Sequence, residues 1–292
     1  MGLLLALLPL WLVGSGVFAL WYYFKKEKAV AEIEQARFSQ AVSSTFLAED
    51  LRKIISIIGE RNSSSNEGRK NLSRMAVMIE GTLGPGNTGF QVKKIDGPAD
   101  WPILQVTITG LEPKKPAVWA ITTYDSPAGS TGAEANATGV AASLAAAQAL
   151  AGEQFSCSVH LLFMPHFNEV ESPAVATAAK VMELIRAPSP PRAVLCVEAM
   201  GLGETLWVTS RDTMAIPLEK VEGLGKVVGA EVACLADDAD LASVLFEMDL
   251  PAVRVSTGPM PHSAVSAGKL PFSPTVAASA GRLVELIRRC AR

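Results

Sequence analysis

Histidine, the side chain that most readily binds transition metals and carries protons at neutral pH, is rare in this sequence. The chain of 292 residues has three histidines, His160, His166 and His262. His160 lies inside an apolar run, so we interpret it as a hydrogen-bonded structural residue of a strand. His166 follows the end of that run and is expected in a solvated loop. His262 is either a polar loop residue or one ligand of a single metal ion.

Carboxylates form one tight group, Asp237, Asp238 and Asp240, which has the donor atoms of a cation site. A solvated acidic loop explains the same spacing, and we predict the loop. Residues 201–203 form a glycine turn without the G-x-G-x-x-G pattern of a dinucleotide site. The sequence also lacks a G-x-S-x-G nucleophile elbow, which argues against a serine hydrolase.

Charge and cysteine content narrow the classes of partner. The chain has 26 basic and 29 acidic residues and no basic stripe, so we expect no nucleic acid partner. Its four cysteines, Cys157, Cys196, Cys234 and Cys290, show no C-x-x-C spacing. We predict free thiols rather than a disulfide framework or a zinc knuckle, which favours a reducing compartment.

Helices and strands alternate along most of the chain. Apolar residues at helical spacing predict two early helices, around Leu47–Ile58 and Leu72–Ile79. Strands are predicted at Gln91–Lys94, Leu104–Thr109, Val118–Thr123, Cys157–Met164, Ala193–Val197, Leu206–Thr209 and Ala252–Ser256. Later helices are predicted at Gly139–Leu150, Ser172–Arg186, Pro217–Val228 and Thr275–Arg289. Several strands are continuous apolar runs, so we predict an α/β fold: a three-layer α/β/α sandwich with a mostly parallel mixed sheet.

Residues 3–24 form an almost wholly apolar segment at the start of the chain. As a helix, such a segment spans about 30 Å, the thickness of the hydrocarbon layer of a membrane. Aromatic residues at positions 21–23 and lysines at 25, 26 and 28 follow, as at a membrane interface. We predict a transmembrane anchor over residues 1–25, a juxtamembrane helix or linker over 26–43, and one globular domain over 44–292.

A cleaved signal peptide is the alternative interpretation of the apolar segment, with a small-residue site near residues 17–19. No lysine or arginine precedes the segment and it is long for a signal core, so we favour an uncleaved, single-pass anchor. The lysines that follow and the free thiols favour a cytoplasmic domain. Gly14, Ser15 and Gly16 lie mid-segment, where small residues let another helix approach, so we expect membrane-protein partners.

Residues 120–150, AITTYDSPAGSTGAEANATGVAASLAAAQAL, resemble a segment of the M28-type zinc aminopeptidases. In that family A-H-Y-D-S precedes G-A-D-D-N-A-S-G-V and an Ala/Leu-rich helix. Later motifs follow in the family's order. The segment LFMPHFNEVESPAVAT at 162–177 resembles the F-x-x-G-E-E segment, and VLCVEAMG at 194–201 resembles N-L-D-M-x-G. Further on, DLPAV at 249–253 resembles G-I-P-A-V, and PHS at 261–263 resembles H-T-P. The resemblance covers residues 44–292 and implies the zinc aminopeptidase fold.

The resemblance implies a site in which two zinc ions activate a shared water molecule. The first metal-binding histidine of the family falls on Thr123, whose hydroxyl is a poor zinc ligand. The acid that orients this histidine is kept as Asp125. The aspartate that bridges the two metals falls on Ala135, which has no donor atom. This segment of the motif therefore lacks two of its ligands.

The remaining positions keep part of the pattern. The family's Glu-Glu pair falls on Val170 and Glu171, with Val170 in place of the general base, when the following segment is aligned without a gap. An alternative register puts Glu169 at the base position and Val170 at the ligand position. The next acid falls on Glu198, and the last histidine is His262. Since neither metal keeps three protein ligands, we predict no cofactor, or at most one weakly bound zinc ion.

These departures predict a pseudoenzyme in which Glu171, Glu198 and His262 are remnant metal ligands. We expect a membrane-anchored scaffold or accessory subunit of a membrane protein complex, for which the enzyme-like domains of nicastrin and nicalin are analogies. A metal-dependent aminopeptidase or other hydrolase with an altered site is one alternative. A module that binds peptides in the old cleft without cleaving them is the other.

Overall fold

The computed structural model describes residues 42–165, 173–186, 190–210, 240–250, 252–258 and 270–292, with shorter pieces at 11, 14–26, 28 and 233–234. Residues 14–26 are helical. No helix in the described part of the chain is both long and apolar enough for a membrane crossing. The predicted anchor over residues 1–25, which includes many residues outside the described ranges, therefore stays a prediction.

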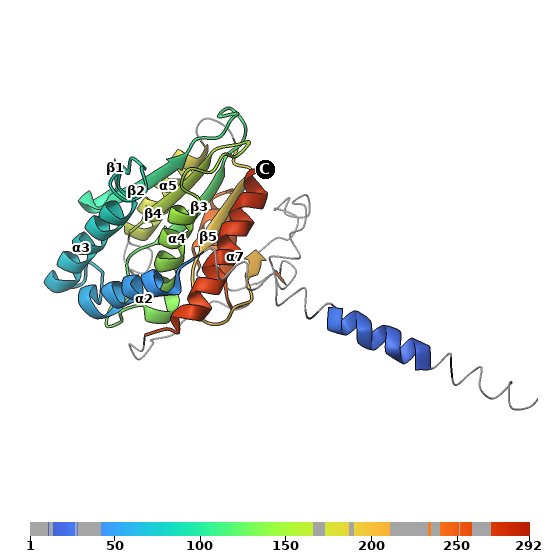
Figure 1. The fold of residues 1–292 in the computed structure, drawn as a ribbon. Coiled ribbons are helices and arrows are strands. Elements are labelled where there is room, and N and C mark those ends of the chain that lie inside the picture. Colours follow the sequence, from blue (N-terminus) through green and yellow to red (C-terminus); the bar gives the residue numbers. More distant parts are fainter. Residues whose placement is uncertain are drawn as a thin grey trace, which may run out of the picture.

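One mixed sheet of eight described strands forms the centre of the domain, in the order β1-β2-β4-β3-β5-β8-β6-β7 (Figure 1). The strands are β1 (Lys93–Asp96), β2 (Pro102–Ile108), β3 (Val118–Thr123), β4 (Val159–Met164), β5 (Ala193–Val197), β6 (Trp207–Ser210), β7 (Ala233–Cys234) and β8 (Ala252–Ser256). The central strands β4, β3, β5 and β8 are mutually parallel, whereas β2 and β6 pair with them antiparallel. The predicted mixed sheet is confirmed.

Helices cover both faces of this sheet. The helices are α2 (Ser44–Arg52), which continues as the π-helical η1 (Lys53–Ile58), α3 (Asn66–Leu83), α4 (Thr138–Ala149) with the π-helical turn η3 (Ala133–Ala137) before it, α5 (Pro173–Arg186), α6 (Leu241–Glu247) and α7 (Ser273–Ala291). A short 3-10 turn, η2, spans Pro98–Asp100. One apolar core joins α2, α3, α4 and α7 to the sheet, and a second joins α5 and α6 to its other face. The result is a three-layer sandwich.

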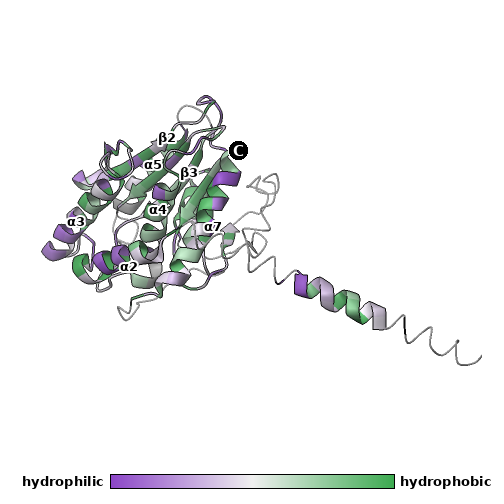
Figure 2. Cartoon of the chain, in the orientation of Figure 1, coloured by the Kyte–Doolittle hydropathy of each residue, from purple (hydrophilic) through white to green (hydrophobic). Residues whose placement is uncertain are grey.

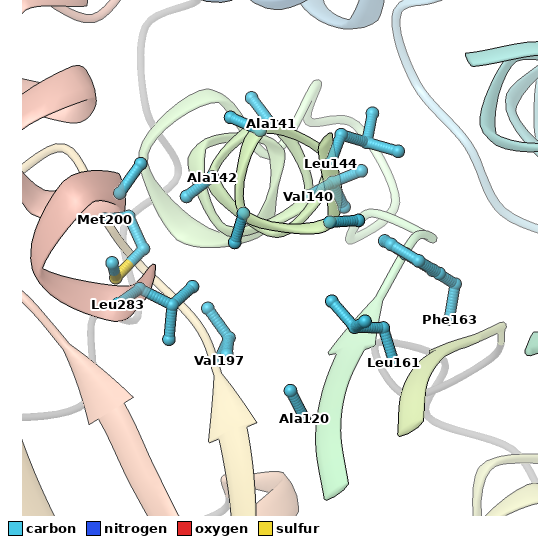
Figure 3. Packing of buried hydrophobic residues seen from close by; sticks show 14 of the residues in the cluster. Ala120, Val140, Ala141, Ala142, Leu144, Leu161, Phe163, Val197, Met200 and Leu283 are labelled. Carbon is cyan, nitrogen blue, oxygen red and sulfur yellow. The ribbon is translucent and has the colours of Figure 1, made fainter. Parts of the chain in front are cut away.

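Helix α4 is the best-buried helix of the first layer. Every residue from Thr138 to Ala147 is buried, because α4 lies between the sheet and helices α2, α3 and α7. Its small side chains let it pack closely on Ala120, Leu161 and Val197 of three strands (Figure 3). Hydropathy follows this arrangement, since the central strands and α4 are apolar while polar residues lie on α3 (Figure 2). Burial on all sides explains why α4 shows no amphipathic pattern in the sequence.

The predicted element boundaries hold best for the central strands. The strands at Val118–Thr123, Ala193–Val197 and Ala252–Ser256 coincide with β3, β5 and β8. The first predicted strand, at Gln91–Lys94, was displaced, because β1 begins at Lys93. The prediction of a solvated acidic loop was wrong for Asp240. This residue is buried and caps α6, with its Oδ1 accepting the Ser243 amide at 2.7 Å. The predicted helix Pro217–Val228 lies outside the described residues.

Candidate functional site

The C-terminal ends of the central parallel strands bring two of the predicted site positions together. Strands β3 and β5 pair in register up to Thr122 and Val197, so the next pair is Thr123 and Glu198. The Glu198 amide donates to Val255 O at 3.0 Å, which extends the ladder by one residue toward β8. Ligand sites of open α/β sheets form at this edge. Thr123 and Glu198 therefore lie side by side where a site is expected.

The turn η3 and the start of α4 lie against the same edge. Asn136 Nδ2 donates to Thr123 O at 3.5 Å, and the Met200 amide donates to Thr138 Oγ1 at 2.9 Å. Gly139 is required here, because a Cβ at this position would overlap Glu198 O. The backbone of position 135 is thus adjacent to the contact with Thr123. The residue that would bridge two metals in the family is an alanine at this edge, and alanine offers no ligand atom.

Asp125 and Arg61 are two fully buried residues near the end of β3, where Thr123 lies. Both side chains have no exposed surface, and the charge of Asp125 opposes the loss of the proton from Arg61. Burial nevertheless lowers the pKa of the Arg61 guanidinium to about 10. Burial and the charge of Asp125 together raise the pKa of Tyr124 well above its usual value. Asp125 is therefore buried near a permanent cation, because a guanidinium with a pKa of about 10 stays protonated at neutral pH.

Arg61 connects three separate segments through its side chain. Nε donates to Tyr124 O at 2.9 Å, and Nη2 donates to Asn136 Oδ1 at 3.4 Å. Nη1 donates to Gly59 O at 2.6 Å and to Ile54 O at 3.3 Å. These bonds fix the end of η1, the end of β3 and η3 relative to one another. This role of Arg61 is not apparent from the sequence, because an arginine in the polar stretch 61–67 is typical of a solvated loop.

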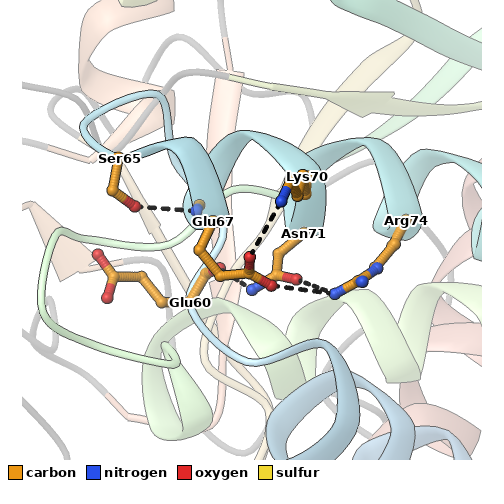
Figure 4. Close-up of polar contacts among 7 residues, drawn as sticks. Glu60, Ser65, Glu67, Lys70, Asn71 and Arg74 are labelled. Carbon is orange, nitrogen blue, oxygen red and sulfur yellow. Dashed lines mark hydrogen bonds and ion pairs between the residues drawn. The ribbon is translucent and has the colours of Figure 1, made fainter.

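The loop that carries Arg61 is itself attached to α3 (Figure 4). Ser65 caps this helix, with Oγ accepting the Gly68 amide at 2.9 Å. Asn71 Nδ2 reaches back to Glu60 O at 3.0 Å, while Arg74 Nη1 donates to Asn71 Oδ1 at 2.8 Å. The exposed ion pairs of Glu67 with Lys70 and Arg74 contribute little on their own, whereas the Asn71 amide bonds directly to the loop backbone.

Glu198 is bound to the second layer of helices. Its Oε1 accepts the Leu241 amide at 3.3 Å, at the N-terminus of α6. The neighbouring thiol of Cys196 is buried, and its pKa is raised by burial and by the charges of Glu198 and Asp240. The described cysteines Cys157, Cys196 and Cys290 are free and buried, as predicted. Glu198 is therefore a partly buried carboxylate that already has a partner within the fold.

Several predicted site positions cannot be placed. Glu169, Val170, Glu171, His166 and His262 lie outside the described residues, as do Asp237 and Asp238. Their roles remain those implied by the family resemblance. Among the residues that the structure does describe, no three His, Cys, Asp or Glu side chains form a group that could hold a metal ion.

His160 is a structural residue, as the sequence indicated. Its ring stacks on Trp119 with centroids 4.1 Å apart. Its Nδ1 lies 2.9 Å from Thr107 Oγ1 and 3.1 Å from Gln105 Nε2. Burial lowers the pKa of His160 to about 4, so the ring is neutral at physiological pH. It lies near the beginning of β4, at the opposite end of the strand from the candidate site.

Comparison with known proteins places this fold among zinc exopeptidases, although no family model and no curated sequence matches the chain. The LapA aminopeptidase of Legionella pneumophila superposes with a TM-score of 0.68 at 17% identity, covering 89% of this chain and 74% of LapA. A Zn-dependent exopeptidase of Parabacteroides distasonis gives 0.59 at 11% identity, covering 85% and 98%. This chain has the M28-type zinc aminopeptidase fold.

The M28-type fold does not determine the reaction by itself. A glutaminyl cyclase of Bacteroides thetaiotaomicron, solved with N-acetylhistamine, superposes with a TM-score of 0.62 at 12% identity, covering 85% of this chain and 98% of the cyclase. Aminopeptidase and cyclase thus share one architecture. Function must be argued from the residues at the strand ends.

The described residues of the M28-like site do not fit a pair of zinc ions. Thr123 offers a hydroxyl, position 135 offers a methyl group, and Glu198 Oε1 accepts a backbone amide. Asp125 lies behind Thr123 beside the charge of Arg61. A dinuclear site needs a bridging carboxylate and nitrogen or carboxylate ligands on each metal. The described residues of this edge therefore do not supply that donor set by themselves.

Proposed function

We propose that the chain is a pseudoenzyme: an M28-like domain that is anchored in a membrane and acts as a scaffold or accessory subunit of a membrane protein complex. The non-catalytic part is supported by the register of β3 and β5, which pairs Thr122 with Val197 and so brings the next residues, Thr123 and Glu198, side by side at the strand edge. The family resemblance implies a histidine next to the acid at position 198, but this chain has the buried Thr123 there. No arrangement of the neighbouring loops turns a hydroxyl and a methyl group into zinc ligands.

The packing around this edge further supports a structural role. Thr123, Asn136 and Arg61 are linked by hydrogen bonds into one buried unit, which leaves little freedom to reposition ligands. Catalytic zinc sites keep one coordination position open for water or substrate. A site whose polar groups bond to one another is suited to holding the loops in place.

The membrane part of the proposal comes from the sequence. Residues 3–24 have the length and apolarity of a transmembrane anchor, with a lysine cluster after them. In the described helix over residues 14–26, Lys25 Nζ lies 5.0 Å from the centroid of the Trp21 ring. An aromatic residue beside a lysine is typical of the membrane interface. Gly14, Ser15 and Gly16 are small residues that let another transmembrane helix approach closely.

The first test is turnover by the full-length chain, purified in mild detergent and supplied with zinc. Aminoacyl p-nitroanilides and peptides with N-terminal glutamine cover the reactions named for structures with this fold. We expect no product above the buffer rate with either substrate. Turnover that is abolished by Glu171→Ala would refute the pseudoenzyme proposal and support the altered hydrolase.

A second test concerns the partner. Mild detergent extraction at native expression, followed by native sizing, is expected to give a particle larger than the detergent-bound monomer, with a second membrane protein in it. Changing Gly14 and Gly16 together to leucine should release that protein, because bulky residues block close helix contact. A monodisperse monomer without a second membrane protein contradicts the scaffold proposal.

A further inference from the structure

A buried arginine in the central sheet lies beside the candidate site. Arg254 is in the middle of β8 and is 1% exposed. In the sheet register it lies opposite Cys196 of β5 and Thr209 of β6. Side chains alternate between faces along a strand, so Arg254 shares a face with Ala252, which packs in the core formed with α5 and α6. The guanidinium therefore lies on the α6 side of the sheet.

The guanidinium of Arg254 is paired within the fold. Its Nε donates to Thr209 Oγ1 at 3.0 Å and lies 3.5 Å from Asp240 Oδ2. The carboxylate of Asp240 is also buried, and its other oxygen caps α6 through the Ser243 amide. This is an ion pair removed from water, so each charge depends on the other.

Glu198 is partly buried and belongs to the same group of charges. Its carboxylate accepts the amide of Leu241, the residue that follows Asp240. The charges of Glu198 and Asp240 both act on the thiol of Cys196, which lies opposite Arg254 in the register. Two carboxylates and one guanidinium thus lie around the N-terminus of α6. We call Glu198, Asp240, Arg254, Thr209 and Cys196 the Arg254 cluster.

Two carboxylates in a protein interior need a nearby cation, because burial strongly disfavours uncompensated negative charge. In the zinc enzymes of this fold the metals can supply that charge. Here a guanidinium is built into the neighbouring strand.

We propose that Arg254 takes the electrostatic place of a metal ion, so that Glu198 serves as an anchor for α6 and not as a metal ligand. This inference rests on the proposed loss of catalysis and adds a mechanism to it. It revises the expectation that Glu198 is a remnant ligand. The cluster holds β5, β8 and α6 together with charges that the chain itself provides, so the domain keeps its shape without zinc.

Thermal unfolding of the full-length chain tests the proposal, with excess EDTA in one arm and zinc chloride in the other. We expect wild type to unfold at the same temperature in both arms. Glu198→Gln should lower Tm by a few degrees, equally in both arms, because it weakens a contact with α6. A saturable rise of wild-type Tm with zinc that is lost in Glu198→Gln would show Glu198 to be a metal ligand and would overturn the proposal.

The arginine is tested by Arg254→Met, which keeps the aliphatic stem and removes the charge. We expect Tm to fall by about 10 °C, because the buried Asp240 and the partly buried Glu198 lose their nearby cation. Adding Asp240→Asn should recover part of this loss, since it removes one of those charges. Arg74→Met, at an exposed arginine, is the matched control and should change Tm little. A loss with Arg254→Met no larger than this control contradicts the proposal.

If Arg254→Met does not fold, the zinc comparison of wild type with Glu198→Gln decides the proposal without it. The outcomes also separate this inference from the proposed function. Zinc binding through Glu198 without turnover contradicts the inference and leaves the pseudoenzyme proposal standing. Turnover in the peptidase or cyclase assay contradicts the pseudoenzyme proposal itself.

Discussion

Two fully buried arginines lie near the candidate site, and they have different kinds of partner. Arg61 donates to three backbone carbonyls and one side-chain amide oxygen, all uncharged. Arg254 donates to a hydroxyl and pairs with a buried carboxylate. The charge of the buried Asp125 also acts on Arg61, so the two arginines differ in their close partners: Arg61 donates hydrogen bonds to uncharged oxygens, whereas Arg254 makes an ion pair with a carboxylate. The hydrogen bonds of Arg61 hold separate segments together, whereas the charge of Arg254 offsets the negative charge of a buried carboxylate.

Replacing Arg61 is expected to have the largest effect. Arg61→Met leaves Tyr124 O, Gly59 O and Asn136 Oδ1 without their donor, and each buried acceptor left unpaired costs about 1–3 kcal/mol. We expect a loss of at least ~4 kcal/mol in the free energy of unfolding, measured by urea denaturation. Arg74→Met should lose less than about 1 kcal/mol. Equal losses in the two variants would show that the Arg61 bonds contribute little.

A double-mutant cycle distinguishes the two arginines by the kind of coupling they have. Arg254→Met and Asp240→Asn, alone and combined, should give a coupling of about 2 kcal/mol or more, because the partners are both charged and buried. The matching cycle of Arg61→Met with Asn136→Ala should give less than about 1 kcal/mol, since the 3.4 Å contact is one of four. Comparable couplings in both cycles would remove the distinction between charge and geometry.

His160 provides a smaller test, in a partly buried ring whose contacts are the uncharged side chains of Gln105, Thr107 and Trp119. Its pKa falls from the ordinary 6.5 to about 4 on folding, so the unfolded chain binds the proton more readily. The stability from the neutral ring is present above pH 6.5 and is lost as the pH falls toward 4. At pH 5 this loss is about 2 kcal/mol relative to pH 7.5.

The His160 effect is measured by urea unfolding at pH 5 and pH 7.5. His160→Gln should remove this part of the pH dependence, because glutamine keeps hydrogen-bonding capacity and does not titrate in this range. A variant with the wild-type pH dependence would show that other groups cause it. Tryptophan fluorescence provides a structural check in the same experiment, because the His160 ring of the wild type stacks on Trp119.

Much of the fold could be predicted from the sequence, and particular residues show why. Strands β3, β5 and β8 are short continuous apolar runs, and their predicted bounds were correct. Helix α6 was missed because it has seven residues, too few for a helical period to stand out. Asp240 was interpreted as a loop residue because a helix cap and a loop acid have the same sequence signature.

The site was less predictable than the fold. A motif alignment indicated which ligands were missing, but the pairing of Thr123 with Glu198 depends on the register of two strands that are far apart in the chain. Arg254 lies in the run AVRVS, where the sequence does not reveal a buried partner on a different element. Arg61 likewise acquires its acceptors only when η1, β3 and η3 meet. Tertiary contacts created these two roles.

The zinc content of the purified full-length chain is the most direct test of the central claim. The chain would be equilibrated with zinc, freed of unbound metal by gel filtration, and measured by elemental analysis against protein concentration. We predict well below two zinc ions per chain, because Thr123 and Ala135 cannot complete a dinuclear site. Two tightly held zinc ions per chain would contradict this account.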